Sequence, residues 1–589
     1  MTVYAITQLL IAPQDNKVRK HGTGAIPLIR AIPPVPKSNK IQKVTYPATY
    51  DLRTLNRVTS VKNQGSCGSC WAFATYSSLE SYLTNESTYN FSEQHLIDNH
   101  GFDNPPCDGG NADMSVAYLA RWSGPMNESA YPYQYGANTP NGVQKHIQEV
   151  QMFGKDMDKI KAYITNYGAL YTSYSTYDSY YNPTYHSYYY TGDDWEGHAV
   201  AIVGWDDNFS RTKFNIDPGS DGAFIVKNSW GTNWSEGDNG YFYVSYQDAF
   251  FGKNNFGFMN AENTQTYNTI YSYDPLGWVT SRGYTDGTPM YAANIFQASS
   301  SESLKAVSFY STYYNNTYEV SVYTNLQNAT DPSSGTLAFS SSITKANIGY
   351  YTVPVTTTVS LVSGQKFAIV VKGIPSDPTN EPWVQAYEDK QSDYSSSASS
   401  QLGQSFYSSN GSSWKDFAER IPTANFCIKA FTAGSTSDFT VAINASPLSG
   451  DAPLDVQFTT TVTNGTEPFV YSWTFGDSST STEENPTHQY TVAGSYTATL
   501  TVTDGDSKSK TTSITIKATS ITPDCQAEYE KGFQAGYQEG LAKGGCAVLE
   551  YDFSISMLCI NVLGTKMPIK LDFFYNVNDP YGYYWKYNY

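Results

Sequence analysis

Two cysteines in the stretch QGSCGSCWAFA are the residues of this sequence best suited to chemistry. They are Cys67 and Cys70, and an apolar pattern with helical periodicity follows them. A helix that begins at Cys70 would place its sulfur at the positive end of the helix dipole, which favours the reactive thiolate. The main-chain N–H of Cys70 would then face an oxyanion. A zinc site is poorly supported, because no second Cys-x-x-Cys pair follows.

A cysteine nucleophile also needs a base and a polar group that orients the base. His198 is the one histidine that opens a strand-like run, GHAVAIVGW. Further along, KNSWG places Asn228 beside Trp230 at the end of another strand-like run. Adjacent strands would bring the imidazole and the amide together, so we expect Cys70, His198 and Asn228 to share one site.

These segments resemble the motifs of papain-like cysteine peptidases. The matching stretches are VKNQGSCGSCWAFA, FSEQHLIDN, CDGGNA, GHAVAIVGW and KNSWGTNWSEGDNGYFYV, in the family's order and at its approximate spacing over about residues 46–250. The resemblance implies an α+β catalytic domain that needs no metal and no organic cofactor. The His-His insertion of exopeptidase relatives is missing from the sequence, which favours an endopeptidase.

The resemblance also implies a role for each matching residue. Cys70 would be the nucleophile and His198 its imidazolium partner. Gln64 would donate to the oxyanion, Asn228 would hold the His198 ring, and Trp230 would shield that hydrogen bond. Gly109 and Gly110 would line the cleft and pair with the substrate backbone, while the small residues Ala112 and Gly197 would leave room for a bulky apolar side chain in the second specificity pocket. Cys67 and Cys107 would form a disulfide.

The segment before the catalytic domain departs from the family. Residues 1–44 are rich in proline, as in AIPPVPKSNK, and form an irregular leader or propeptide-like segment. The family's long helical inhibitory propeptide has no counterpart in them. The sequence therefore does not predict control of activity by a removable propeptide.

The rest of the chain predicts a multidomain protein. After a peptidase domain at 45–260, short alternating runs such as LKAVSFY and KFAIVVK predict an all-β sandwich at 261–435, similar to the lectin-like jelly-roll domain attached to some microbial papain-like peptidases. Regularly spaced strands at 436–518 predict an immunoglobulin-like sandwich. The stretch YSWTFGDSSTSTEENPTHQYTVAGSYTATLTVTD resembles a PKD domain.

Residues 519–589 predict a small α+β region without readable chemistry. Its helix would carry an apolar stripe of Tyr529, Phe533, Tyr537 and Leu541. Cys525 and Cys546 flank that helix, and whether they form a disulfide stays open.

Composition narrows the partners and the location. The net charge is −18, with 54 acidic against 36 basic side chains, which argues against nucleic acid. No stretch reaches the ~18 apolar residues of a membrane helix. The start lacks the basic n-region and cleavage site of a signal peptide. The accessory domains nevertheless favour an extracellular or cell-surface location.

Together these features predict a secreted or surface-associated cysteine endopeptidase that acts on protein or peptide substrates. An alternative is an adhesion or glycan-binding surface protein, with contacts to glycans or cell-surface polymers through its β domains. Its catalytic domain would then be incidental or of transpeptidase type.

Overall fold

The computed structural model describes residues 22–36, 44–134, 142–234, 237–284, 286–377, 381–434, 439–463, 465, 468–505 and 508–520, and the backbone of 555–562, 565–575 and 583–587. The chain forms two compact units, Met1–Ser437 and Asp438–Tyr589. Each unit is described by itself below.

The helices of the described residues lie in the part of the first unit that carries the cysteine and histidine motifs. They are α1 (Cys70–Leu83), α2 (Glu93–Asn99), α3 (Ala112–Ala120) and α4 (Met157–Asn166), with 3₁₀ turns η1 (Asp178–Tyr180) and η2 (Arg211–Lys213). Ser92, Asn111 and Asp156 cap α2, α3 and α4 by accepting a main-chain N–H three residues on. α1 begins at Cys70, as the sequence predicts, and is buried along most of its length.

Most strands of the same part follow these helices in the chain. They are β1 (Thr49–Asp51), β2 (His146–Phe153), β3 (Leu170–Ser175), β4 (Tyr181–Asn182), β5 (Ser187–Tyr188), β6 (Gly197–Asp206), β7 (Ala223–Lys227), β8 (Tyr241–Ser245) and β9 (Asn255–Glu262). The central strand β6 pairs antiparallel with β3 and β7. Its residues from His198 to Trp205 are all buried, which explains its almost unbroken apolar run.

The following strands form the predicted β-sandwich. They are β10 (Thr269–Tyr271), β11 (Thr280–Tyr284), β12 (Tyr291–Gln297), β13 (Glu302–Ser311), β14 (Asn316–Thr324), β15 (Thr336–Lys345), β16 (Ile348–Leu361), β17 (Lys366–Ile374), β18 (Trp383–Glu388), β19 (Ser405–Ser408), β20 (Lys415–Asp416), β21 (Asn425–Phe426) and β22 (Lys429–Gly434). Val320 of β14 and Ile369 of β17 share one core with Leu304 and Val307 of β13. Alternate residues of two facing sheets therefore meet, as expected for a sandwich.

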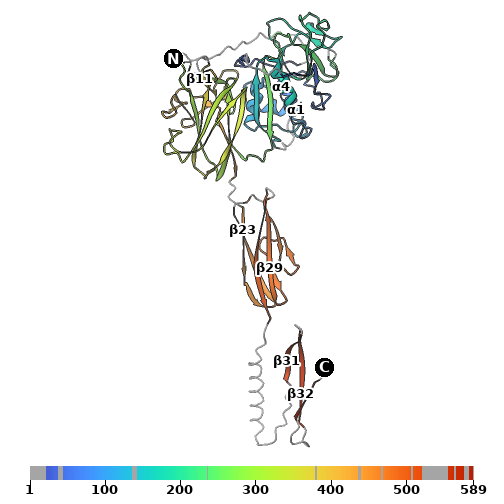
Figure 1. Ribbon diagram of the computed structural model, residues 1–589, viewed down its shortest axis with the longest axis vertical. Coiled ribbons are helices and arrows are strands. Elements are labelled where there is room, and N and C mark those ends of the chain that lie inside the picture. The colour runs from blue at the N-terminus through green and yellow to red at the C-terminus, as the bar shows by residue number, and fades with distance from the viewer. Residues whose placement is uncertain are drawn as a thin grey trace. The chain divides into compact units, whose positions relative to one another are not determined.

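One sheet runs through both parts of the first unit. Its order is β10-β22-β13-β16-β2-β9-β3-β6-β7-β8-β5-β4, with β1 paired to β6. β16 joins β2 antiparallel, with Ile348 opposite Met152 and Tyr350 opposite Val150. Figure 1 shows the two parts side by side, with α1 and α4 in one and β11 in the other. Main-chain hydrogen bonds therefore connect the peptidase-like part to the sandwich.

The second unit holds the predicted immunoglobulin-like sandwich. Its strands are β23 (Thr440–Ser446), β24 (Ser449–Asp451), β25 (Leu454–Thr463), β26 (Val470–Thr474), β27 (Thr480–Ser481), β28 (Thr487–Tyr490), β29 (Gly494–Thr503) and β30 (Ser509–Thr519), in sheets β23-β25-β28 and β24-β30-β29-β26-β27. Trp473 and Tyr490 are fully buried in its core.

The C-terminal region contains a three-stranded antiparallel sheet of β31 (Ile555–Val562), β32 (Thr565–Tyr575) and β33 (Tyr583–Tyr587). The helix expected around Tyr529 to Leu541, and the pair Cys525 and Cys546, lie outside the described residues. Among the described helices, none is long and apolar enough to cross a membrane. The domain limits inferred from the sequence stay predictions.

Candidate active site

Cys70 is the first residue of α1, in the peptidase-like part of the first unit. The main-chain N–H of Ala199 in β6 lies 3.3 Å from its sulfur. Because Ala199 follows His198, this contact places the start of β6 directly against the start of α1. The Cys70 side chain is completely buried.

His198 and Asn228 meet as the adjacent strands predict. Asn228 directly follows β7, and its Oδ1 lies 2.8 Å from Nε2 of His198. The main-chain N–H of Ser229 also points at this Oδ1, at 2.8 Å. A main-chain N–H can only donate, so the acceptor is the amide oxygen, and Nε2 of His198 carries a proton. Trp230 stacks on the His198 ring, with centroids 4.4 Å apart, and covers this bond.

Gln64 is fully buried and held at both ends of its amide. Its Oε1 accepts the hydroxyl hydrogen of Ser229 at 2.6 Å, and its Nε2 donates to the carbonyl of Cys67 at 2.8 Å. This orientation turns the amide NH₂ toward the loop that leads into Cys70. Ser229 was not a predicted site residue. Only its place next to Asn228 could have indicated it.

Cys67 and Cys107 form the predicted disulfide. The N–H of Gly68 also donates to the carbonyl of Cys107 at 3.0 Å. The loop before α1 is therefore fixed to the segment that continues into Gly109 and Gly110. Among the described cysteines, Cys70 and Cys427 are free thiols.

The leader segment lies in the cleft over Cys70. Ala25 forms a parallel bridge with Gly110, and the N–H groups of Gly24 and Ala25 donate to the carbonyl of Gly197 at 3.2 and 3.0 Å. The indole N–H of Trp230 donates to the carbonyl of Gly22 at 3.1 Å. The sequence did not predict such a blocking segment. It has no periodicity, and its position depends entirely on contacts with distant residues.

Two small residues predicted for the cleft, Gly197 and Gly109, explain how the leader fits. A Cβ on Gly197 would lie 1.8 Å from the carbonyl oxygen of Ala25, and a Cβ on Gly109 would lie 2.7 Å from that of Gly24. Gly109 also has φ +104°, a conformation that favours glycine. Ala112 begins α3 and is fully buried. The cleft therefore accepts a polypeptide backbone at very close range.

The covered sulfur is a poor nucleophile. Burial raises the pKa of Cys70 to about 11, and main-chain hydrogen bonds from Ala199, Gly24, Trp71 and Ala25 offset this only in part. With the leader in place, the residue is therefore a thiol at neutral pH.

A helix that starts at a cysteine, facing a strand that starts at a histidine held by an asparagine, defines the papain-like class of thiol hydrolase. Models of three families match consecutive parts of the chain: the papain family cysteine protease (residues 46–265), the lectin like domain (270–432) and the PKD domain (441–518).

Solved structures and curated sequences agree with this assignment. The chain is similar to the protease and lectin-like domains of Cwp84, a surface layer associated protein of Clostridium difficile, with 29% identity and a TM-score of 0.62 over 71% of this chain and 93% of that one. A clostridial Cwp84 after propeptide cleavage gives 31% identity and 0.60 over 66% and 99%. The chain belongs to the papain family of cysteine proteases.

Each of the two curated relatives below matches about a third of this chain. A viral cathepsin from Choristoneura fumiferana defective polyhedrosis virus is 35% identical over 208 residues, which are 34% of this chain and 59% of that protein. A viral cathepsin from Choristoneura fumiferana nuclear polyhedrosis virus gives 34% identity with 34% and 59% coverage. The chain thus spans about three-fifths of the length of these relatives.

Proposed function

We propose that the protein is a cysteine endopeptidase that acts on protein or peptide substrates. The observation that carries this proposal is the convergence of three groups: the buried Cys70 sulfur, the His198 ring held by Asn228, and the Gln64 amide held by Ser229. Each is fixed by a hydrogen bond of 2.6 to 3.3 Å. Family membership supports the same activity.

The chemistry follows from these positions. The Cys70 thiolate attacks the scissile carbonyl carbon, and the carbonyl oxygen becomes an oxyanion near Nε2 of Gln64 and the main-chain N–H of Cys70. Because Nε2 of His198 is bound to Asn228, Nδ1 exchanges the proton and delivers it to the leaving amine. The resulting acyl-thioester is then cleaved by water, whose proton returns through His198 to the sulfur.

The leader acts as an inhibitor within the same chain. It covers the sulfur and pairs with Gly110 and Gly197 where a substrate backbone would lie, and in this covered state burial raises the pKa of Cys70. Activity therefore requires that residues 22–36 leave the cleft. The small residues Ala112 and Gly197 then admit a bulky apolar side chain beside the scissile bond.

The experiment uses a cleavable chain, in which the recognition site of a sequence-specific protease replaces residues 37–43 of the full sequence. An epoxysuccinyl reagent should label Cys70 after the cut and removal of the leader, and leave the uncut chain unlabelled. The Cys70→Ala variant should show neither labelling nor peptide cleavage. Labelling that persists in Cys70→Ala, or an unlabelled cut chain that cleaves no peptide, contradicts the proposal.

A second candidate function is binding to glycans or other cell-surface polymers outside the cell. The match of residues 270–432 to a lectin like domain supports it, as does the PKD match at 441–518. Similarity to a surface layer associated protease supports an extracellular or surface location. Binding of the Cys70→Ala chain to a glycan array tests this function.

A transpeptidase reaction at Cys70 would use the same acyl-thioester as hydrolysis. Product analysis with an added amine acceptor separates the two reactions.

A further inference from the structure

The side chain of Arg30, four residues beyond Ile26 in the leader, fills a pocket between the two parts of the first unit. Its Nη2 lies 2.5 Å from Oδ1 of Asp113 and 3.1 Å from the sulfur of Met152. Its guanidinium carbon lies 3.7 Å from the ring centroid of Trp278. Asp113 and Met152 belong to the peptidase-like part and Trp278 to the sandwich. We call these three residues the acid–aromatic pocket.

The peptidase wall of the pocket has supports outside the leader, although the Asn111 amide also donates to the carbonyl of Pro27 at 3.3 Å. Asp113 stands in the first turn of α3, where the unpaired amides and the dipole favour a carboxylate. Asn111 caps this helix through the N–H of Met114, and the hydroxyl of Tyr394 from the sandwich donates to the same Asn111 oxygen at 3.2 Å. The start of α3 is therefore held from both sides.

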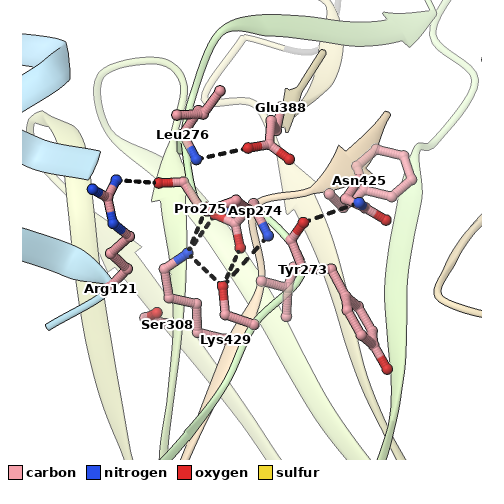
Figure 2. Close-up of polar contacts among 12 residues, drawn as sticks. Arg121, Tyr273, Asp274, Pro275, Leu276, Ser308, Glu388, Asn425 and Lys429 are labelled. Carbon is pink, nitrogen blue, oxygen red and sulfur yellow. Dashed lines mark hydrogen bonds and ion pairs between the residues drawn. The ribbon is translucent and has the colours of Figure 1, made fainter. Parts of the chain in front are cut away.

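The aromatic wall is fixed by a buried polar network. Figure 2 shows Arg121 of the peptidase-like part donating to the carbonyl of Pro275, at 2.7 Å, and the N–H of Leu276 donating to Glu388, at 2.6 Å. The buried ammonium of Lys429 pairs with Asp274 in the same loop. Trp278 lies two residues after Leu276 on this loop, so the same hydrogen bonds restrict its position.

The Trp278 ring itself is also anchored. Its indole N–H donates to the hydroxyl of Ser281 at 2.9 Å, and its ring packs edge-on against Tyr310. Both walls of the pocket will therefore persist when the leader leaves.

With the leader bound, the Asp113 side chain is only 6% exposed, and departure of Arg30 would leave its carboxylate without this cation, next to an indole face. A buried charge without a partner is unfavourable, and the face of an indole attracts cations. A guanidinium suits both walls, because it pairs with carboxylates and stacks on aromatic rings.

The pocket is within reach of a chain bound in the cleft. The N–H of Ile26 donates to the carbonyl of Gly110 at 3.1 Å, and Arg30 follows four residues later. Four residues of extended chain span about 13 Å, so a peptide bound at Gly110 can place a side chain in the pocket.

We propose that, once the leader has left, the acid–aromatic pocket binds an arginine side chain of the polypeptide substrate, so that the sandwich takes part in substrate selection. This inference rests on the proposed peptidase function. It gives Trp278 a role in peptide recognition, separate from any binding of glycans.

The test compares arginine with citrulline, which has the same shape without the charge, at each position of a twelve-residue peptide series. The cut and leader-free cleavable chain should cleave one arginine peptide about tenfold faster in kcat/KM than its citrulline counterpart, as expected for a charge-assisted contact. Asp113→Asn should remove the preference, and Trp278→Leu should reduce it. Asp217→Asn, at an exposed carboxylate, should keep it.

Equal rates for arginine and citrulline at every position would overturn the inference while leaving the peptidase function intact. If no peptide is cleaved, the peptidase function fails, and the pocket is then judged by binding. In that assay, fluorescence polarisation measures a peptide of residues 22–36 on the cut Cys70→Ala chain. A citrulline at position 30 should weaken binding about tenfold, and unchanged binding would overturn the pocket as well.

Discussion

The indole N–H of Trp230 donates to the carbonyl oxygen of Gly22 across 3.1 Å. The same ring stacks on His198. A residue that shields the catalytic histidine is therefore also a binding site for the blocking segment. The proposed inhibition and the proposed catalysis would therefore use the same Trp230 side chain, so departure of the leader would uncover a group of the candidate active site.

The reactivity of Cys70 should change sharply when the leader is removed. With the leader bound, burial raises the pKa of Cys70 to about 11, so the thiol form dominates at pH 7. After the cut, access of water and the helix N-terminus should lower this pKa. Iodoacetamide alkylation at pH 7, followed by mass spectrometry, should show fast modification of Cys70 in the cut chain alone.

Cys427 is the internal control for that measurement. It is a buried free thiol in the sandwich whose pKa is raised by burial, and no described hydrogen bond joins it to the leader. Its alkylation should stay slow in both forms. Equal alkylation of Cys70 before and after the cut would contradict the blocking role of the leader.

The substitution Gly197→Ala should weaken the leader's hold without any cut. A Cβ at this position would lie 1.8 Å from the carbonyl oxygen of Ala25, so the leader must shift outward. We expect faster alkylation of Cys70 in the uncut variant than in the uncut natural chain. Gly434→Ala is the matched control, because its Cβ would meet nothing within 4 Å. No change in Gly197→Ala would mean that the leader tolerates the added methyl group.

The substitution Asn228→Ala should lower kcat/KM of the cut chain about 100-fold, because the His198 ring loses the acceptor that orients it and stabilises its charged form. The imidazolium should also become more acidic, which moves the alkaline limb of the pH–rate profile to lower pH. Asn208→Ala, at an exposed position, should leave both the rate and the profile unchanged. A loss of rate with an unmoved profile would indicate a purely structural role for Asn228.

Removal of the disulfide should destabilise the first unit. The bridge joins residues 40 apart in sequence, and closing a loop of that size in the unfolded chain is worth about 4 kcal/mol. The double variant Cys67→Ala and Cys107→Ala should therefore unfold at a lower temperature, as measured by calorimetry. The same double change at Cys525 and Cys546 should leave that transition in place, since those residues belong to the second unit.

The buried Glu388 should make stability depend on pH. Burial is the main cause that raises its pKa from 4.5 to about 8, and Asp274 adds to the rise. The folded state thus binds this proton more tightly than the unfolded state does. The associated stability is complete below pH 4.5 and is lost as the pH rises through 8.

The variant Glu388→Gln lacks this titration. The natural chain should lose unfolding free energy between pH 5 and pH 8, and the variant should lose less. The difference between the two, measured by urea denaturation, should therefore grow over this range in favour of the variant. Glu419→Gln, at an exposed position, should follow the natural chain at every pH. Parallel curves for Glu388→Gln would show that this carboxyl group is not protonated in the folded state.

Much of the catalytic arrangement could be predicted from the sequence, because its residues lie at the starts and ends of regular elements. Cys70 begins a helix, His198 lies at the start of a strand, and Asn228 directly follows the next strand. The alternating runs likewise indicated both sandwiches. Each of these signals is local, or depends on the pairing of neighbouring strands.

Other features depend on contacts between distant residues and had no local signal. The leader is an irregular chain whose place is set by Gly110 and Gly197. The pairing of β16 with β2 joins Tyr350 to Val150, and no pattern in either strand specifies that partner. For the same reason the contact of Arg30 with the sandwich could not be predicted.

The ladder between β2 and β16 has a mechanical consequence. Two domains joined by a flexible linker can each bind a target in any relative orientation, and the linker only raises the effective concentration of the second domain. In this protein, a hinge motion between the peptidase-like part and the sandwich would have to break the main-chain hydrogen bonds between β2 and β16. The cleft and the Trp278 wall therefore form a rigid template, and a polymer that touches both must match their fixed spacing.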